Sequence, residues 1–421
     1  MKAAAAAGQG SYQYEIAWTT LGEYLDHMEE RGVSPNVASF VGATTIRIHE
    51  LGRDDVQPDA EQLARMQELV REAMREGALG VGTSLIYPPA FFAGNQEITA
   101  LAQAAAEFGG GYVSHMRSEA DRFLEALEET IGIARATGQR AEVYHLKAAG
   151  EHNWPKMAQA IDMIRQARAE GVQVSANMYA YTAGATGLTV ALPPWVQAGG
   201  RAEMERRLRD PEIRARVINE MRAPGEWENL RLLTGSDERV LLTGFRNPAL
   251  RELAGQTLAE VSAARGTSPE DTIIDLILED GSRVGTAYFL MSEENVELGL
   301  RQPWVSLGSD SGAMAPEGVF LDSNPHPRAY GNFARFLGHY VRDRGLMPLE
   351  EAIHRLTGLP AANWKLRDRG CLDPGCHADI VVFDPEAIAD HATYARSQQL
   401  ATGVSDVFVN GVQVLDAGQH T

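Results

Sequence analysis

The feature that most constrains the fold is a regular alternation of short apolar runs with longer amphipathic segments. Helical spacing of apolar residues, ending on glycine, occurs in five segments: 21–32, 59–77, 95–109, 123–138 and 156–171. Strand-like runs occur in five others: 37–48, 78–87, 111–117, 141–148 and 172–181. Strands that alternate with helices in this way predict a parallel sheet with crossover helices, which is an α/β fold.

The alternation breaks at about residue 201. Charged, irregular sequence up to residue 300 predicts a small inserted subdomain, with short strands at 230–235 and 239–244. A sixth parallel strand is expected at 304–312, followed by helices around 332–345 and 349–364. The tail alternates like antiparallel strands, and Asn410-Gly411 is typical of a hairpin turn.

Six strong parallel strands are two fewer than a closed TIM (β/α)8 barrel requires. The pattern therefore predicts a barrel that lacks its first two strands. We expect four parts, with these boundaries: barrel residues 1–200, an inserted subdomain 201–300, the barrel completion 301–368, and β-sandwich strands 369–421.

Three predicted strands end in side chains that bind metals: His115, His145 and Asp310. The carboxyl ends of parallel barrel strands meet at one face, so these residues converge if the fold is right. Two imidazoles and a carboxylate suit Zn²⁺, and a carboxylate beside a hydrolytic water can carry its proton. Each residue also has an ordinary explanation, because a strand-end histidine can be structural and an aspartate in a turn can be a cap.

Cationic and phenolic residues accompany these strand ends. Lys147, Arg328 and Tyr87 are predicted to bind a substrate carboxylate, which Arg can grip with two hydrogen bonds. Arg117 is expected to be an ordinary ion-pair residue, with Glu119 as its partner. Among the other histidines, His152 and His326 are expected in loops that border the site.

Composition excludes several classes of partner. With 38 Lys+Arg against 57 Asp+Glu, the net charge of -19 argues against nucleic acid or an anionic membrane surface. No run approaches a membrane span, and the alanine run at 3–7 is too short for a signal peptide. Cys371 and Cys376 do not match zinc-site spacing, are expected to be incidental, and suit a reducing cytoplasm.

Several motifs occur together in one order: "GALGVGTSLIYPPAFFAGNQEI", "YVSHMRSE", "YHLKAAGEHNW", "NMYAYTAGATGLT", "LGSDSG", "HPRAYGNFARFLG" and "GCLDPGCHADIVVFDP". In these motifs, from about Tyr14 onward, the chain resembles the N-acyl-D-amino-acid deacylases of the amidohydrolase superfamily. The resemblance implies a TIM barrel with a small β-sandwich, one or two zinc ions, and hydrolysis of N-acyl-D-amino acids. It implies that His115 and His145 bind zinc and that Asp310 activates the hydrolytic water. It also implies that Tyr87, Lys147 and Arg328 hold the substrate carboxylate.

The resemblance is incomplete at the N-terminal end. The family's histidine-x-aspartate or histidine-x-histidine motif and its zinc-binding cysteine have no counterpart here, because no His or Cys precedes Tyr14. We therefore expect a chain truncated at its N-terminus, with a weakened zinc site and low activity. Two alternatives stay open. A hydrolase of cyclic amides would resemble dihydroorotases and hydantoinases, but no lysine lies in 78–87 to bridge two metals. An inactive barrel could instead act as a binding subunit of unknown oligomeric state.

Overall fold

The computed structural model describes residues 14–421. The six predicted parallel strands form one sheet, and its spatial order is β1-β2-β3-β4-β5-β9. Their bounds are β1 (Val41–Gly42), β2 (Gly80–Ser84), β3 (Gly111–His115), β4 (Ala141–Val143), β5 (Val174–Met178) and β9 (Val305–Leu307). Every neighbouring pair is parallel, which confirms the predicted α/β sheet of six strands.

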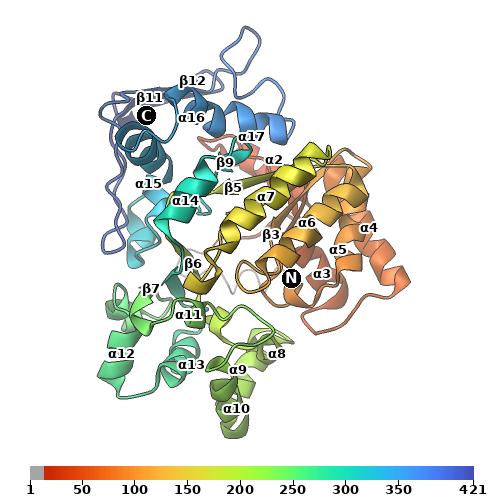
Figure 1. Ribbon diagram of the computed structural model, residues 1–421, viewed down its shortest axis with the longest axis vertical. Coiled ribbons are helices and arrows are strands. Elements are labelled where there is room, and N and C mark those ends of the chain that lie inside the picture. Colours follow the sequence, from red (N-terminus) through yellow and green to blue (C-terminus); the bar gives the residue numbers. More distant parts are fainter. Residues whose placement is uncertain (1–13) are drawn as a thin grey trace.

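The crossover helices cover the outside of this sheet and pack on one another in chain order (Figure 1). They are α4 (Ala60–Arg75), α5 (Asn95–Ala106), α6 (Phe123–Thr137) and α7 (Lys156–Ala169), with α14 (Glu293–Leu300) beside α7. Leu127, Ile131 and Ile164 are buried on their inner faces, in one core with strand residues such as Val143. Helix α2 (Leu21–Arg31) also forms as predicted, with Thr20 in a capping box.

Two glycines show why the strand starts are rich in this residue. Gly80 has a φ of +152°, and a Cβ there would lie 1.9 Å from the carbonyl oxygen of Gly111. At Gly111, a Cβ would lie 2.8 Å from the ring of Trp364. The glycines therefore allow close approach of neighbouring backbone and side chains, as expected for glycine within strands.

One predicted strand is much shorter than expected, and another is wrong. Only Val41–Gly42 of the predicted strand at 37–48 is extended, and α3 (Ala43–Leu51) follows at once. The β-branched residues there favour a strand, but Ala43, Ile46 and Arg47 are buried at helical spacing, and Arg47 pairs with Glu97 of α5. Likewise, the predicted strand at 230–235 is the short helix α11 (Leu230–Leu233), capped by the Asn229 side chain.

The second predicted short strand of the inserted segment is present as β7 (Val240–Gly244). It belongs to an antiparallel sheet of order β6-β8-β7, with β6 (Ala183–Gly187) and β8 (Gly285–Phe289). Helices surround this sheet and share its core: α8 (Pro194–Gln197), α9 (Arg201–Arg209), α10 (Pro211–Met221), α12 (Leu258–Arg265) and α13 (Pro269–Asp280). Figure 1 shows this green part of the chain at one end of the molecule. The domain boundaries of the sequence analysis stay a prediction.

The C-terminal part lies at the opposite end from the inserted helices (Figure 1). After α15 (Arg328–Arg335), the π-helical segment η7 (Phe336–Asp343), α16 (Leu349–Leu356) and α17 (Gly358–Asn363), the chain forms a four-stranded antiparallel sheet. Its strands are β10 (Ile380–Phe383), β11 (Val404–Val409), β12 (Val412–Asp416) and β13 (Gln419–His420). The predicted hairpin at Asn410-Gly411 is confirmed, since both residues have positive φ between β11 and β12.

The expectation that the two cysteines are incidental is wrong. Cys371 and Cys376 form a disulfide, because the turn between them brings their Cα atoms to 6.3 Å. Within residues 14–421 no helix is long and apolar enough to cross a membrane. The alanine run at 3–7 lies outside the described residues.

Candidate metal centre

The two histidines that the sequence singles out lie side by side at the carboxyl ends of neighbouring strands. His115 is the last residue of β3, and His145 follows β4 by two residues with a φ of +40°. Nδ1 of His115 is 2.9 Å from Nε2 of His145. The side-chain oxygen of Asn177 in β5 accepts the backbone N–H of His145 at 2.8 Å, which holds this unusual backbone in place.

A buried carboxylate, Glu119, lies against the second histidine. Its Oε1 is 2.6 Å from Nζ of Lys147 and 2.8 Å from Nδ1 of His145. His115, Glu119 and His145 each offer a ligand atom, and these atoms all lie within 4.8 Å of one another. We call these three residues the histidine–glutamate cluster.

The charges of this cluster follow from its burial. Burial lowers the pKa of His115 to about 3, so its imidazole is neutral at physiological pH. Burial alone would raise the pKa of Glu119, but Lys147 and the two histidines hold it well below its usual range. The cluster therefore presents two imidazoles and an ionised carboxylate, which is a donor set that zinc accepts. Nε2 of His115 is buried with no hydrogen-bond partner within residues 14–421, as suits a nitrogen left for a ligand.

The other predicted residues form a second group at the end of β9. Asp310 has a φ of +47° and a side chain that is 42% exposed, and its Oδ2 is 2.8 Å from an Nη atom of Arg328. Arg328 itself is buried, and its Nε and second Nη have no partner within the described chain. We call Asp310 and Arg328 the aspartate–arginine pair.

Tyr179, one residue after β5, connects the two groups. The guanidinium of Arg328 is 4.5 Å from the centre of the Tyr179 ring, and Nζ of Lys147 is 5.7 Å from it. Burial raises the pKa of Tyr179, and the charges of Asp310 and Glu119 add to this shift. The two carboxylates therefore act on the same phenol, whose ring contacts a cation from each group.

Tyr87 lies next to the first histidine. Its ring centre is 5.3 Å from that of His115, and its hydroxyl donates to Oγ1 of Thr186 in β6 at 3.0 Å. Burial raises the pKa of Tyr87 to about 12, so the phenol stays a neutral donor. This contact links the barrel site to the antiparallel sheet of the inserted part.

The structure thus brings together His115, His145, Lys147 and Tyr87, and it places Asp310 with Arg328 rather than within the histidine–glutamate cluster. The expected pairing of Arg117 with Glu119 is wrong. Arg117 turns instead to Glu129 of α6, at 3.0 Å, and to the carbonyl groups of Phe91 and Ala93.

Two bordering histidines lie outside the cluster. His152 is mostly exposed and contacts Asp121, with its Nε2 2.6 Å from Oδ1. His326 is buried, and its Nδ1 accepts the backbone N–H of Arg328 at 3.0 Å.

Sequence reasoning missed Glu119 and Tyr179 as site residues. Glu119 lies in the loop after β3, where strand periodicity no longer says which way a side chain points. Tyr179 directly follows a strand, and its sequence context does not distinguish it from a buried aromatic residue of the core. Its position between Lys147 and Arg328 depends on α15, which begins at Arg328 and lies far away in the chain.

Comparisons with known proteins show the family of this chain. A family model described as "Amidohydrolase family" matches residues 1–415. A D-aminoacylase of Alcaligenes xylosoxydans xylosoxydans is 34% identical over 98% of this chain and 73% of its own length. An N-acyl-D-aspartate deacylase of the same organism is 33% identical over 96% of this chain and 70% of its own.

Solved structures extend the comparison to the fold. A crystal structure of D-aminoacylase superposes with a TM-score of 0.78 at 32% identity, over 96% of this chain and 73% of that one. An N-acyl-D-glutamate deacylase from Bordetella bronchiseptica, complexed with zinc and a phosphonate inhibitor, also has a TM-score of 0.78, at 30% identity over the same shares. The match over nearly the whole chain shows that this protein belongs to the amidohydrolase family.

Proposed function

We propose that this protein is a zinc-dependent hydrolase that cleaves the amide bond of N-acyl-D-amino acids. The products are a carboxylate from the acyl group and a D-amino acid. The observation that carries the proposal is the pair of facing imidazoles, His115 and His145, together with buried Arg328 on the Tyr179 ring, which has unpartnered N–H groups within residues 14–421. The named activities of the relatives, D-aminoacylase and N-acyl-D-aspartate deacylase, supply the substrate class.

His115 and His145 would hold the metal, because each offers a ring nitrogen within the 4.8 Å span of the cluster and the lowered pKa of His115 keeps its ring neutral. The proposal includes one or two zinc ions. The sequence predicts Asp310 as a further ligand, but Asp310 pairs with Arg328 outside the histidine–glutamate cluster, so we propose the acid–base role for it. Zinc, when bound, polarises the amide carbonyl and so favours attack by water. Glu119 compensates the charge at the site and orients His145 through its 2.8 Å contact with Nδ1.

Asp310 is the proposed acid–base residue. Its carboxylate is exposed enough to meet water, and it takes one proton from the attacking water as the new C–O bond forms. The same carboxylic acid then delivers that proton to the amide nitrogen as the C–N bond breaks. Arg328, whose Nη atom lies 2.8 Å from Oδ2 of Asp310, holds this carboxylate in place.

Arg328, Lys147 and Tyr87 are proposed to bind the substrate α-carboxylate. Arg328 is best prepared for this role, since its Nε and one Nη have no partner within residues 14–421. Lys147 already contacts Glu119 and His145, so it adds positive charge beside Arg328 across the Tyr179 ring. To bind the substrate, the hydroxyl of Tyr87 would have to give up its hydrogen bond to Thr186.

The substrate is a small molecule, and neither nucleic acid nor a membrane is part of the proposed reaction. The cytoplasmic location expected from the sequence stays a prediction. The disulfide between Cys371 and Cys376 removes the argument that these cysteines suited a reducing compartment.

The test is release of a D-amino acid by the purified full chain loaded with zinc. N-acetyl-D-methionine and N-acetyl-D-glutamate serve as substrates, and their L-enantiomers serve as controls. We expect turnover of a D-substrate that a chelator abolishes and zinc restores. Turnover of a hydantoin instead would favour a cyclic-amide hydrolase, and a chain that binds zinc yet hydrolyses none of these substrates would refute the proposal.

A further inference from the structure

A second buried glutamate, Glu228, contacts the loop that carries Glu119. Its Oε1 accepts three hydrogen bonds: from the hydroxyl of Ser118 at 2.6 Å, from the backbone N–H of Ala120 at 2.7 Å, and from the backbone N–H of Glu119. These partners lie 108 to 110 residues away in the chain. Glu228 is only 9% exposed, so this is an interior contact and not a surface contact.

The loop is fixed on both sides of Glu119. The backbone N–H of Glu119 donates to Glu228, and its carbonyl oxygen accepts the N–H of Ala149 at 2.7 Å. Within the loop, Oγ of Ser118 accepts the N–H groups of Ala120 and Arg122, each at 3.2 Å. With the main chain held in this way, the side chain of Glu119 is directed at Lys147 and His145.

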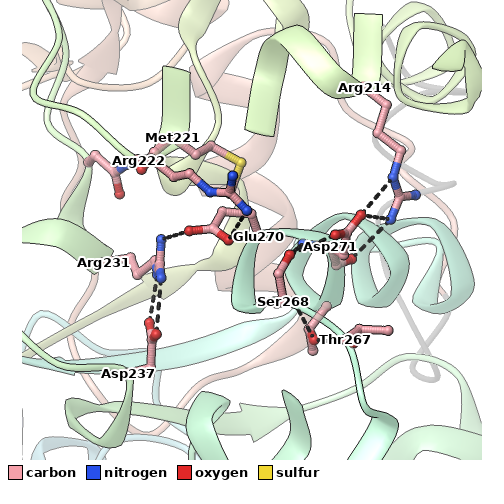
Figure 2. Close-up of polar contacts among 11 residues, drawn as sticks. Arg214, Met221, Arg222, Arg231, Asp237, Thr267, Ser268, Glu270 and Asp271 are labelled. Atoms are coloured by element: carbon pink, nitrogen blue, oxygen red, sulfur yellow. Dashed lines mark hydrogen bonds and ion pairs between the residues drawn. The ribbon is translucent and has the colours of Figure 1, made fainter. Parts of the chain in front are cut away.

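Glu228 is itself held by the inserted part of the chain. It precedes Asn229, whose side chain caps α11 and also donates to the carbonyl group of Met221 at 3.0 Å. In α11, Arg231 binds both carboxylate oxygens of Asp237, at 2.6 and 3.0 Å, and Glu270 of α13 at 2.7 Å. Figure 2 shows this network, in which Arg222 at the end of α10 also reaches Glu270.

The network is well suited to give α11 a fixed position. Glu270 is 6% exposed and Arg231 is 11% exposed at the side chain, so solvent screens their contact weakly. Ser268 caps α13 by accepting the N–H of Asp271, and Arg214 of α10 binds Asp271 at 2.9 Å (Figure 2). Helices α10, α11 and α13 are therefore joined by charged contacts, and Glu228 extends from this unit toward the barrel.

We propose that Glu228 is a positioning residue, through which the inserted helices set the orientation of Glu119 and hence the zinc affinity of the barrel site. The inference rests on the proposed zinc-dependent function, but Glu228 itself is no part of the proposed metal or substrate site. Outer residues that orient ligands commonly change metal affinity 10- to 100-fold when they are replaced.

The first experiment uses the zinc-free protein and measures amide hydrogen exchange. In Glu228→Ala, the N–H groups of Glu119 and Ala120 lose their acceptor, so their exchange should accelerate by at least about tenfold. In Glu228→Gln, the amide oxygen can accept the same three hydrogen bonds, so exchange should stay near that of the unchanged protein. This measurement needs neither zinc nor substrate, so it is independent of the proposed activity.

The second experiment measures zinc affinity by competition with a chromophoric chelator. Glu228→Ala should bind zinc about 10- to 100-fold more weakly, and Glu228→Gln should restore the affinity. Val217→Ala is the matched control, because Val217 is fully buried in α10 and belongs to the same inserted core. It should lower the melting temperature without changing the zinc affinity.

Two results would overturn the inference. One is unchanged exchange at Glu119 and Ala120 in Glu228→Ala. The other is an equal loss of zinc affinity in Val217→Ala at the same loss of melting temperature, since general destabilisation would then explain the effect. If Glu228→Ala does not fold, Glu228→Asp serves as the test variant. Its side chain is one methylene shorter, so it should weaken zinc binding to an intermediate degree. If the protein hydrolyses no N-acyl-D-amino acid while these zinc and exchange results hold, only the proposed activity is refuted.

Discussion

The histidine–glutamate cluster and the aspartate–arginine pair differ in how completely the protein surrounds them. His115, Glu119 and His145 are buried and bonded to one another and to Lys147. Asp310 is 42% exposed, and buried Arg328 keeps N–H groups without partners in the described chain. One half of the site is therefore organised before any ligand arrives, while the other half keeps hydrogen-bonding capacity for a ligand.

The largest expected effect is a difference in bound zinc between a variant of the histidine–glutamate cluster and a variant of the aspartate–arginine pair. In His145→Ala, the cluster loses a ring nitrogen that faces His115, so bound zinc and activity should both fall to background. In Asp310→Asn, zinc should be retained while kcat falls by about 10²- to 10⁴-fold, which is the usual contribution of a general acid–base group. Metal analysis of the purified chains and kcat for N-acetyl-D-methionine check this prediction. Equal zinc loss in both variants would instead place Asp310 among the ligands.

A smaller effect is expected from Arg328→Lys. An ammonium group cannot grip a carboxylate through two parallel hydrogen bonds, so KM should rise by about 10- to 100-fold with little change in kcat. Steady-state kinetics with N-acetyl-D-methionine give both constants. Arg135→Lys is the control, because Arg135 forms exposed ion pairs with Glu128 and Glu170 and should leave KM unchanged. A fall in kcat alone would contradict a binding role for Arg328.

The smallest expected effect is on the pH dependence of stability, through His326, which accepts the backbone N–H of Arg328. Burial, followed by the charge of Arg328, holds the pKa of His326 well below its usual value. In the unfolded chain, His326 therefore binds a proton near pH 6.5, whereas in the folded protein it stays neutral. The folded protein consequently loses stability as the pH falls below 6.5. Between pH 7.5 and 5.5, urea unfolding should show that His326→Asn loses about 1 kcal/mol less than the unchanged protein. Identical losses would show that His326 already carries the proton when folded.

Much of the fold could be predicted from the order of elements. The six parallel strands and the antiparallel C-terminal hairpin follow from apolar periodicity and from Asn410-Gly411, which are local signals. Residues 43–51 and 230–233 could not be assigned in this way. Their β-branched and leucine-rich sequences suit a strand equally well, and burial against neighbouring elements decided for helices.

The same division applies to the candidate site. Local sequence patterns place His115, His145 and Asp310 at the ends of parallel strands, and strand ends of one sheet gather at one edge. Three contacts follow from long-range packing instead: Glu119 with Lys147, Asp310 with Arg328, and Glu228 with the loop after β3. These contacts join side chains in loops far apart in the chain. Loop backbone has no fixed period, so its direction depends on long-range hydrogen bonds that no local pattern of residues records.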